Sequence, residues 1–248
     1  MKNIEIFCTL GPSSFNKNFL KFVDKKISLL RLNMSHIQPK DLSKHIKFIK
    51  KYTTTPICID TEGAQIRTKT KKIINFKKNQ KFKIYKNNNK IMFYPPDTFQ
   101  KLKIGDELDI GFNDLKARII KKNLKFMTLK TISAGIFENN KGVNLNNREI
   151  KLNYLTEKDF KAIEIAKKFN IKFFALSFTN TQEDIIKFNQ ILPKQKKIFK
   201  IETKKAVSNI NKLFKFANNF LIDRGDLSKS INIENIPIAQ RQIIKKSL

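Results

Sequence analysis

Short apolar segments that end in charged or polar residues recur along this chain, and they constrain its fold more than any other feature. Three such junctions place 60–67, 200–202 and 223–227 directly after apolar runs. Short apolar runs that alternate with helical patterns indicate βα units and a parallel sheet. Polar side chains just beyond the carboxyl end of a buried strand are typical of the active-site face of an α/β barrel. The sequence therefore predicts an α/β fold with a site at these strand ends.

The same alternation extends over most of the chain. Apolar runs predict strands over 4–9, 28–32, 57–59, 172–176, 197–201 and 220–223. Helical spacing predicts helices over 15–26, 39–51, 157–169, 182–191, 204–217 and from about Pro237. Ser14 is expected to cap the first helix, and Thr156 to Asp159 form a capping-box sequence before the third. These βα units predict an incomplete TIM-type (β/α) barrel made of residues 1–68 and 141–248.

Between residues 69 and 140 the helical pattern is replaced by short β-type runs. Strands are expected over 82–85, 91–94, 107–110, 117–120 and 126–129, with turn-forming residues between them. We expect a small all-β domain, inserted after the third strand, that acts as a mobile lid. An inert β decoration is the alternative reading.

The net charge of +30 arises from 51 Lys and Arg residues against 21 Asp and Glu residues. Lysine is spread over nearly all predicted helices and loops, whereas Arg31, Arg67 and Arg224 lie at the strand-end motifs. A dedicated nucleic-acid module would concentrate its basic residues, so this pattern favours compositional drift. The positive field still permits nonspecific binding of polyanions, and a basic RNA-associated protein remains an alternative.

Cys8 and Cys58 both fall on predicted interior strands. They are expected to be buried thiols of a reducing compartment rather than a disulfide. No segment has the length of a signal peptide's apolar core or of a membrane span. A cytoplasmic protein without membrane association is the expectation.

The strand-end residues suggest chemistry on phosphoryl groups. Glu202 and Asp226 offer carboxylate oxygens suited to a hard divalent cation, Mg²⁺ first or Mn²⁺. Lys200 lies two positions before Glu202, so both side chains leave the same face of an extended backbone. A divalent cation, an ammonium and a guanidinium in one pocket would stabilise charge on transferring phosphoryl oxygens.

Several segments in order resemble the pyruvate kinase family, from about Ile4 to the last residues. These segments are Cys8–Ser14, Arg31–His36, Asp60–Thr68, Lys141–Leu145, Leu155–Asp159, Leu176–Phe178, Lys200–Glu202, Arg224–Leu227 and Ile238–Gln242. Their order and spacing make the resemblance specific.

The resemblance implies phosphoryl transfer from phosphoenolpyruvate to ADP, giving pyruvate and ATP in glycolysis. By the same resemblance the catalytic residues would be Lys200 and Arg67, and the Mg²⁺ ligands Glu202 and Asp226. The substrate would contact Arg31, Lys200, Gly225 and Asp226. The nucleotide would contact His36, Arg67 and Lys141. The ligands of K⁺ would be Asn33, Ser35, Asp60 and Thr61.

Some positions depart from the family pattern. Glu62 stands where lysine is usual, and Ala64–Gln65 replaces a Pro–Glu pair, which puts the use of K⁺ in question. Asp223 occupies the place of a small residue and adds a carboxylate beside the expected metal site. Asn180 replaces a basic residue, and Lys204–Lys205 replaces a His–Glu pair.

The family would continue after Leu248 with two further βα units and a regulatory domain. An open six-strand sheet would leave edges exposed. We therefore expect that a homo-oligomer or another chain completes the barrel, or that the barrel stays incomplete. We expect no sugar-phosphate activation of this chain by itself. A non-catalytic or repurposed relative, acting as a binding or regulatory protein, is the main alternative to an active enzyme.

Overall fold

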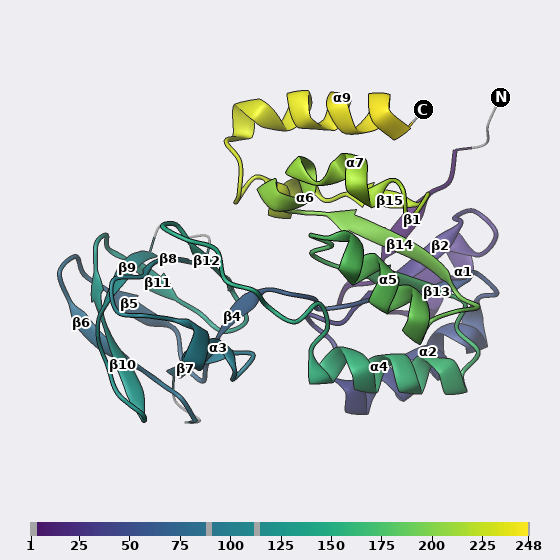
Figure 1. Cartoon of the computed structure of the whole chain (residues 1–248). Coiled ribbons are helices and arrows are strands. Elements are labelled where there is room, and N and C mark those ends of the chain that lie inside the picture. Colours follow the sequence, from purple (N-terminus) through teal and green to yellow (C-terminus); the bar gives the residue numbers. More distant parts are fainter. Residues whose placement is uncertain (1–3, 88–90, 112–114, 248) are drawn as a thin grey trace. The chain divides into compact units, whose positions relative to one another are not determined.

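The computed structural model describes residues 4–87, 91–111 and 115–247, and the chain forms two compact units (Figure 1). The first, here called the sheet unit, comprises Met1–Ala64 and Asn153–Leu248. The second, the insert unit, comprises Gln65–Leu152, a wider range than the predicted 69–140.

The sheet unit contains a six-stranded sheet in the order β1-β2-β3-β13-β14-β15, in which every neighbouring pair is parallel. Its strands are β1 (Phe7–Thr9), β2 (Leu29–Asn33), β3 (Ile57–Asp60), β13 (Phe173–Leu176), β14 (Lys196–Ile201) and β15 (Phe220–Ile222). Its helices are α1 (Lys17–Val23), α2 (Pro39–Tyr52), α4 (Glu157–Lys168), α5 (Gln182–Ile191), α6 (Lys204–Ser208), α7 (Ile210–Leu213), α8 (Arg224–Leu227) and α9 (Ile236–Ser247), with a 3-10 turn at Ile233–Asn235. The predicted α/β fold, an incomplete TIM-type barrel with a β-rich insert after the third strand, is confirmed.

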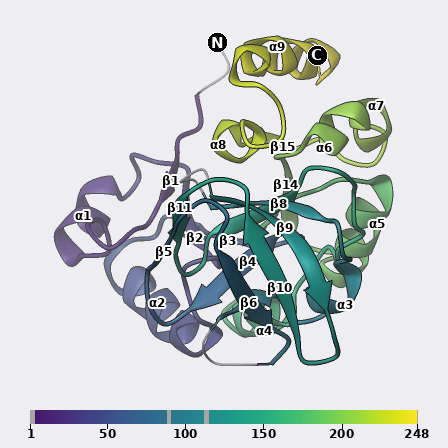
Figure 2. The ribbon, with the colours of Figure 1, turned by 90° about the vertical axis from the view of Figure 1, so that its left-hand side faces the viewer.

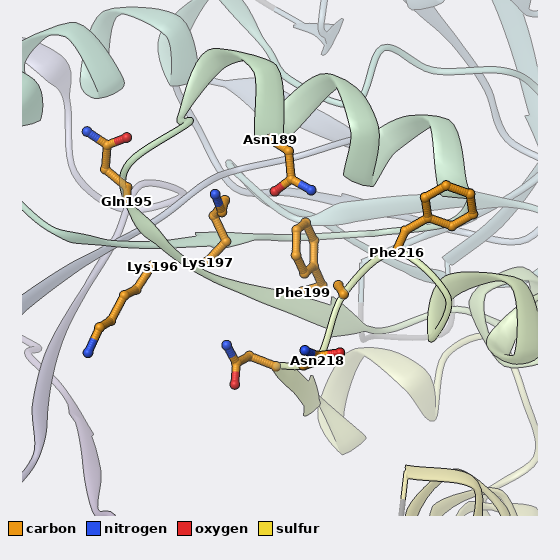
Figure 3. Close-up of a pocket in the computed structure, with 9 residues that line it drawn as sticks. Asn189, Gln195, Lys196, Lys197, Phe199, Phe216 and Asn218 are labelled. Atoms are coloured by element: carbon orange, nitrogen blue, oxygen red, sulfur yellow. The ribbon is translucent and has the colours of Figure 1, made fainter.

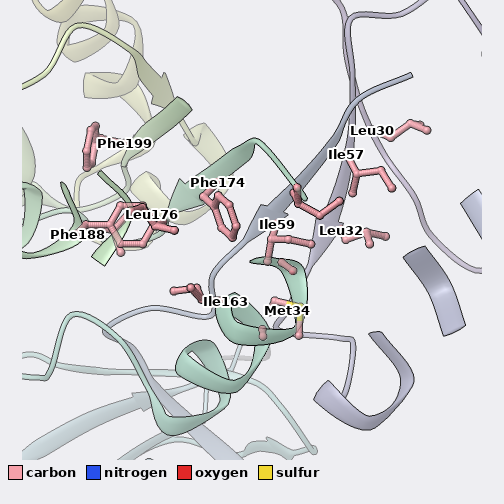
Figure 4. Close-up of a cluster of buried hydrophobic side chains, with 14 of the residues drawn as sticks. Leu30, Leu32, Met34, Ile57, Ile59, Ile163, Phe174, Leu176, Phe188 and Phe199 are labelled. Carbon is pink, nitrogen blue, oxygen red and sulfur yellow. The ribbon is translucent and has the colours of Figure 1, made fainter. Parts of the chain in front are cut away.

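Successive side chains of each strand alternate between the two faces of the sheet, so one face carries the apolar core and the other carries polar residues. The members of the main apolar cluster on β2, β3, β13 and β14 are Leu30, Leu32, Ile57, Ile59, Phe174, Leu176, Phe199 and Ile201, several of which Figure 4 shows together. The residues between them, including Arg31, Asp60 and Lys200, project from the opposite face because successive side chains of a strand alternate. The helices cover the apolar face, as contacts of α4 with α2 and with β3 show.

Two helix predictions need correction. The first helix is capped by Asn16, whose side chain accepts a hydrogen bond from the Phe19 amide, whereas Ser14 bonds within its own turn to Gly11. The predicted helix over 204–217 consists of two short helices, α6 and α7, that are interrupted at Asn209. The Asn209 side-chain amide donates to the carbonyl of Asn180, and such side-chain bonds compete with helix continuation.

The insert unit is a closed barrel in the order β10-β6-β7-β4-β12-β8-β9, with β6, β10 and β9 side by side in Figure 2. Its strands are β4 (Ile66–Thr70), β6 (Lys81–Tyr85), β7 (Ile91–Tyr94), β8 (Glu107–Ile110), β9 (Leu115–Lys122), β10 (Phe126–Thr131) and β12 (Gly142–Leu145). A separate pair, β5 (Ile74–Phe76) with β11 (Gly135–Phe137), and the short helix α3 (Thr98–Lys101) complete the unit. Stacked and edge-on rings of Phe76, Phe82 and Phe137 lie in its core. The predicted insert strands are present, and β4, β5, β11 and β12 were not predicted.

No described helix combines the length and the apolar character that crossing a membrane requires. The two cysteines are free. Cys58 is buried on β3 as predicted, whereas the prediction for Cys8 is wrong, because this residue is only half-buried on β1, an edge strand of the sheet.

Candidate active site

The candidate site lies at the carboxyl ends of β2, β3 and β14. Register pairs Asn33 of β2 with Asp60 of β3, and Asp60 with Ala175 of β13. Arg31, Asp60 and Lys200 share the face opposite the apolar cluster, so parallel pairing brings together groups that are far apart in sequence.

Asp60 is fully buried and contacts two cationic side chains, those of Arg31 and Lys200. Arg31 donates from Nε to Asp60 Oδ2 at 2.7 Å, and its Nη2 contacts the same oxygen. Lys200 Nζ is 3.3 Å from that oxygen, while Ser177 Oγ donates to Asp60 Oδ1 at 3.2 Å. Removing this carboxylate would take from Arg31 its ion-pair partner and from Lys200 one of its carboxylate contacts.

Lys200 also contacts two further carboxylates, at 2.7 Å to Glu202 Oε1 and 3.2 Å to Asp223 Oδ2. Burial alone would lower the pKa of Lys200, but Asp60 and Glu202 outweigh it and the pKa is raised. The lysine is therefore a permanent cation, fitted to bind anionic groups rather than to exchange protons near neutral pH.

Burial raises the pKa of Glu202 to about 7, although Lys200 acts in the opposite direction. The backbone N–H of Phe178 donates to Glu202 Oε2, with Phe178 held at a φ of 52°. Such a conformation is uncommon for a bulky residue.

Glu202, Asp223 and Asp226 can each place one carboxylate oxygen within 4.8 Å of the others. Glu202 Oε1 contacts the lysine ammonium, yet it accepts no hydrogen bond of suitable geometry and is buried. An all-oxygen set of this kind fits a hard divalent cation. The structure brings the two predicted ligands together and adds Asp223, which was not among them.

The four oxygen-bearing residues predicted for K⁺ lie on neighbouring strand ends. Asn33 Oδ1 accepts from the Ser35 amide at 3.0 Å. Both Asp60 oxygens are engaged as described above, and Thr61 Oγ1 accepts from the Ser177 amide at 3.0 Å. The set is thus assembled at one edge of the sheet, where protein donors contact Asn33, Asp60 and Thr61.

Asp159 holds the turn that follows β3. From the sequence, this residue was expected only to cap a helix. Its carboxylate accepts from the Glu62 amide at 2.6 Å, the Gly63 amide at 3.1 Å and the Thr156 amide and hydroxyl at 3.0 Å each. The predicted capping box of Thr156 and Asp159 is confirmed. The capping-box motif was the sequence signal, but the bond to a turn 97 residues earlier depends on the fold.

The remaining predicted residues lie on α8, just beyond β2 and in the insert unit. Gly225 and Asp226 form part of α8, where Lys229 pairs with Asp226 and the Asp223 side chain caps the helix. His36 is exposed just beyond β2. Arg67 and Lys141 belong to the insert unit, where Arg67 of β4 faces Gly142 of β12 and Lys141 pairs with Glu138.

A separate pocket of about 230 Å³ lies near the amino end of β14 (Figure 3). It is lined by Asn189, Gln195, Lys196, Lys197, Phe199, Phe216, Ala217, Asn218 and Asn219. None of the predicted site residues lines it.

The family model for the pyruvate kinase barrel domain matches residues 1–248. The chain belongs to the pyruvate kinase family. A pyruvate kinase of Methanocaldococcus jannaschii is 31% identical to this chain, and the match covers 99% of this chain and 54% of that relative. A pyruvate kinase of Thermotoga maritima is 28% identical, and the match covers 100% of this chain and 57% of that relative. The crystal structure of Cryptosporidium parvum pyruvate kinase superimposes with a TM-score of 0.86 at 28% identity, covering 98% of this chain and 56% of that one.

The chain spans about half the length of the pyruvate kinases that it matches. Family membership confirms the resemblance that the strand-end motifs predicted. The family match covers both units, because the matched residues include the insert unit as well as the sheet unit.

Proposed function

We propose that this chain forms the barrel portion of a pyruvate kinase, transferring a phosphoryl group from phosphoenolpyruvate to ADP with Mg²⁺ or Mn²⁺. The observation that carries the proposal is Lys200, buried at the strand ends within contact of Asp60, Glu202 and Asp223. A buried ammonium beside carboxylates suited to a cation matches the needs of phosphoryl transfer.

In this proposal each side chain acts through charge and position. Glu202 and Asp226 hold the divalent cation, which when bound neutralises developing charge on phosphoryl oxygens. Lys200 stabilises negative charge on the transferring group and on the enolate left behind. Arg31, oriented by its bonds to Asp60 and Thr9, offers its guanidinium to the phosphate. Backbone amides around Gly225 meet the substrate carboxylate.

The remaining assignments concern the nucleotide and the monovalent cation. Arg67 takes part in catalysis, and together with His36 and Lys141 it contacts ADP or ATP. Asn33, Ser35, Asp60 and Thr61 would hold K⁺, and supporting this, they occupy adjacent strand ends. The insert serves as a lid. The enzyme works in glycolysis in the cytoplasm.

The deciding test is pyruvate formation from phosphoenolpyruvate and ADP with Mg²⁺ and K⁺, for the wild-type chain and Lys200→Met. We expect the variant to lose about 10²–10³-fold in kcat, the usual cost of removing one preorganised electrostatic group. Lys196→Met is the matched control, because Lys196 lies on the same strand but is exposed, and it should retain activity.

A wild-type chain that binds phosphoenolpyruvate with Mg²⁺ but forms no pyruvate would instead be a repurposed relative. Absence of both binding and turnover would overturn the proposed function.

A further inference from the structure

Asp223 lies beside the proposed cation ligands and has no role in the reaction assigned so far. It directly follows β15 and precedes α8, so it stands at a strand end like the other site residues. Its two carboxylate oxygens have different neighbours: Oδ1 accepts from the Asp226 amide at 3.4 Å, and Oδ2 lies 3.2 Å from Lys200 Nζ.

These contacts leave Asp223 facing the cation site. Its carboxylate, with those of Glu202 and Asp226, meets the distance limit for ligands of one ion. Around Lys200 three carboxylates (Asp60, Glu202 and Asp223) face two cationic side chains, Lys200 and Arg31. The cluster thus has more carboxylates than cationic partners, and a divalent cation would offset the excess.

We propose that Asp223 is a third carboxylate ligand of the divalent cation in this chain, in addition to Glu202 and Asp226. The inference rests on the proposed function, since it assumes that the cation binds at Glu202. A third carboxylate raises affinity for the cation, because each added anionic oxygen strengthens attraction to a hard ion. It also lowers the positive charge of the loaded site and so weakens its attraction for an anionic substrate.

The test separates the ligand role from the helix-capping role. Asp223→Asn removes the charge but keeps a side-chain oxygen, and asparagine caps helices about as well as aspartate. Mn²⁺ affinity is measured directly, by the electron paramagnetic resonance signal of free Mn²⁺ during titration of the full chain. We expect Asp223→Asn to weaken Mn²⁺ binding at least about 10-fold.

Two controls complete the design. Asp97→Asn removes the same charge from a partly buried pair with Lys101 in the insert unit and should leave Mn²⁺ affinity unchanged. Glu202→Gln should abolish binding and thereby tests the proposed site itself.

Equal Mn²⁺ affinity of Asp223→Asn and the wild-type chain, with binding lost in Glu202→Gln, would overturn the inference while leaving the proposed function intact. Unchanged binding in Glu202→Gln, or no binding by the wild-type chain, would overturn both. A lower melting temperature of metal-free Asp223→Asn with unaltered Mn²⁺ affinity would assign Asp223 a purely structural role.

Discussion

Gly63 shows how a single residue limits the structure beside the site. Its φ of +71° is unfavourable for residues with a Cβ, and a Cβ at this position would lie 2.7 Å from the Ser177 carbonyl oxygen. Since the obstacle is backbone of the residue that also supports Asp60, it cannot move without disturbing the site.

We therefore expect Gly63→Ala to lower the free energy of unfolding by about 3 kcal/mol, from conformational strain and the clash together. Gly11→Ala is the matched control, because no atom lies within 4 Å of the position that its Cβ would take, and it should change stability by less than about 0.5 kcal/mol. Urea unfolding followed by circular dichroism measures both. Equal effects of the two substitutions would contradict the assigned crowding at Gly63.

At the scale of elements, two capping boxes in the sheet unit look alike in sequence but differ in what they hold. Asp159 of α4 and Asp184 of α5 are both the third helical residue and both bond back to their N-cap threonine. Asp184 otherwise accepts from the nearby Asn180 amide, whereas Asp159 also binds the turn that follows β3. Of these two boxes, the one at α4 joins its helix to a distant strand end.

Asp159→Ala should consequently cost about 3–5 kcal/mol of unfolding free energy, because it leaves buried amides of Glu62 and Gly63 without acceptors. Asp184→Ala removes mainly a cap and should cost about 1 kcal/mol. Chemical denaturation of both variants provides the comparison. Similar losses would show that the long-range bonds add nothing to stability.

At the scale of the whole molecule, the net charge of +30 is the dominant feature. Like charges repel more strongly in the compact state than in the unfolded chain, so folding proceeds against this repulsion. Raising the ionic strength shortens the screening length from about 30 Å at 0.01 M to about 10 Å at 0.1 M.

We expect the melting temperature to rise by several degrees over this range of sodium chloride, as seen by thermal scans with circular dichroism. Tetramethylammonium chloride should act alike, because screening depends on ionic strength rather than on the identity of the cation. A melting temperature that falls with salt would mean that ion pairs such as Arg148 with Asp106 outweigh the repulsion.

Local pattern alone was enough to predict the βα alternation, the β-rich insert and the strand-end motifs. Side-chain periodicity and capping residues act over a few neighbours, which is why α5 and the Thr156 capping box were predicted at their observed positions. The same local rules missed β4 and β12, whose pairing joins distant parts of the sequence, as Arg67 with Gly142 shows.

The tertiary structure alone decided which charges meet. Parallel register brings Arg31 and Lys200 onto Asp60, and the end of β15 brings Asp223 to Lys200. It also makes Asp159 the link between α4 and the turn after β3. The spacing of residues along the chain does not determine these distances, because contacts between separate strands are set by sheet order and register rather than by sequence neighbours.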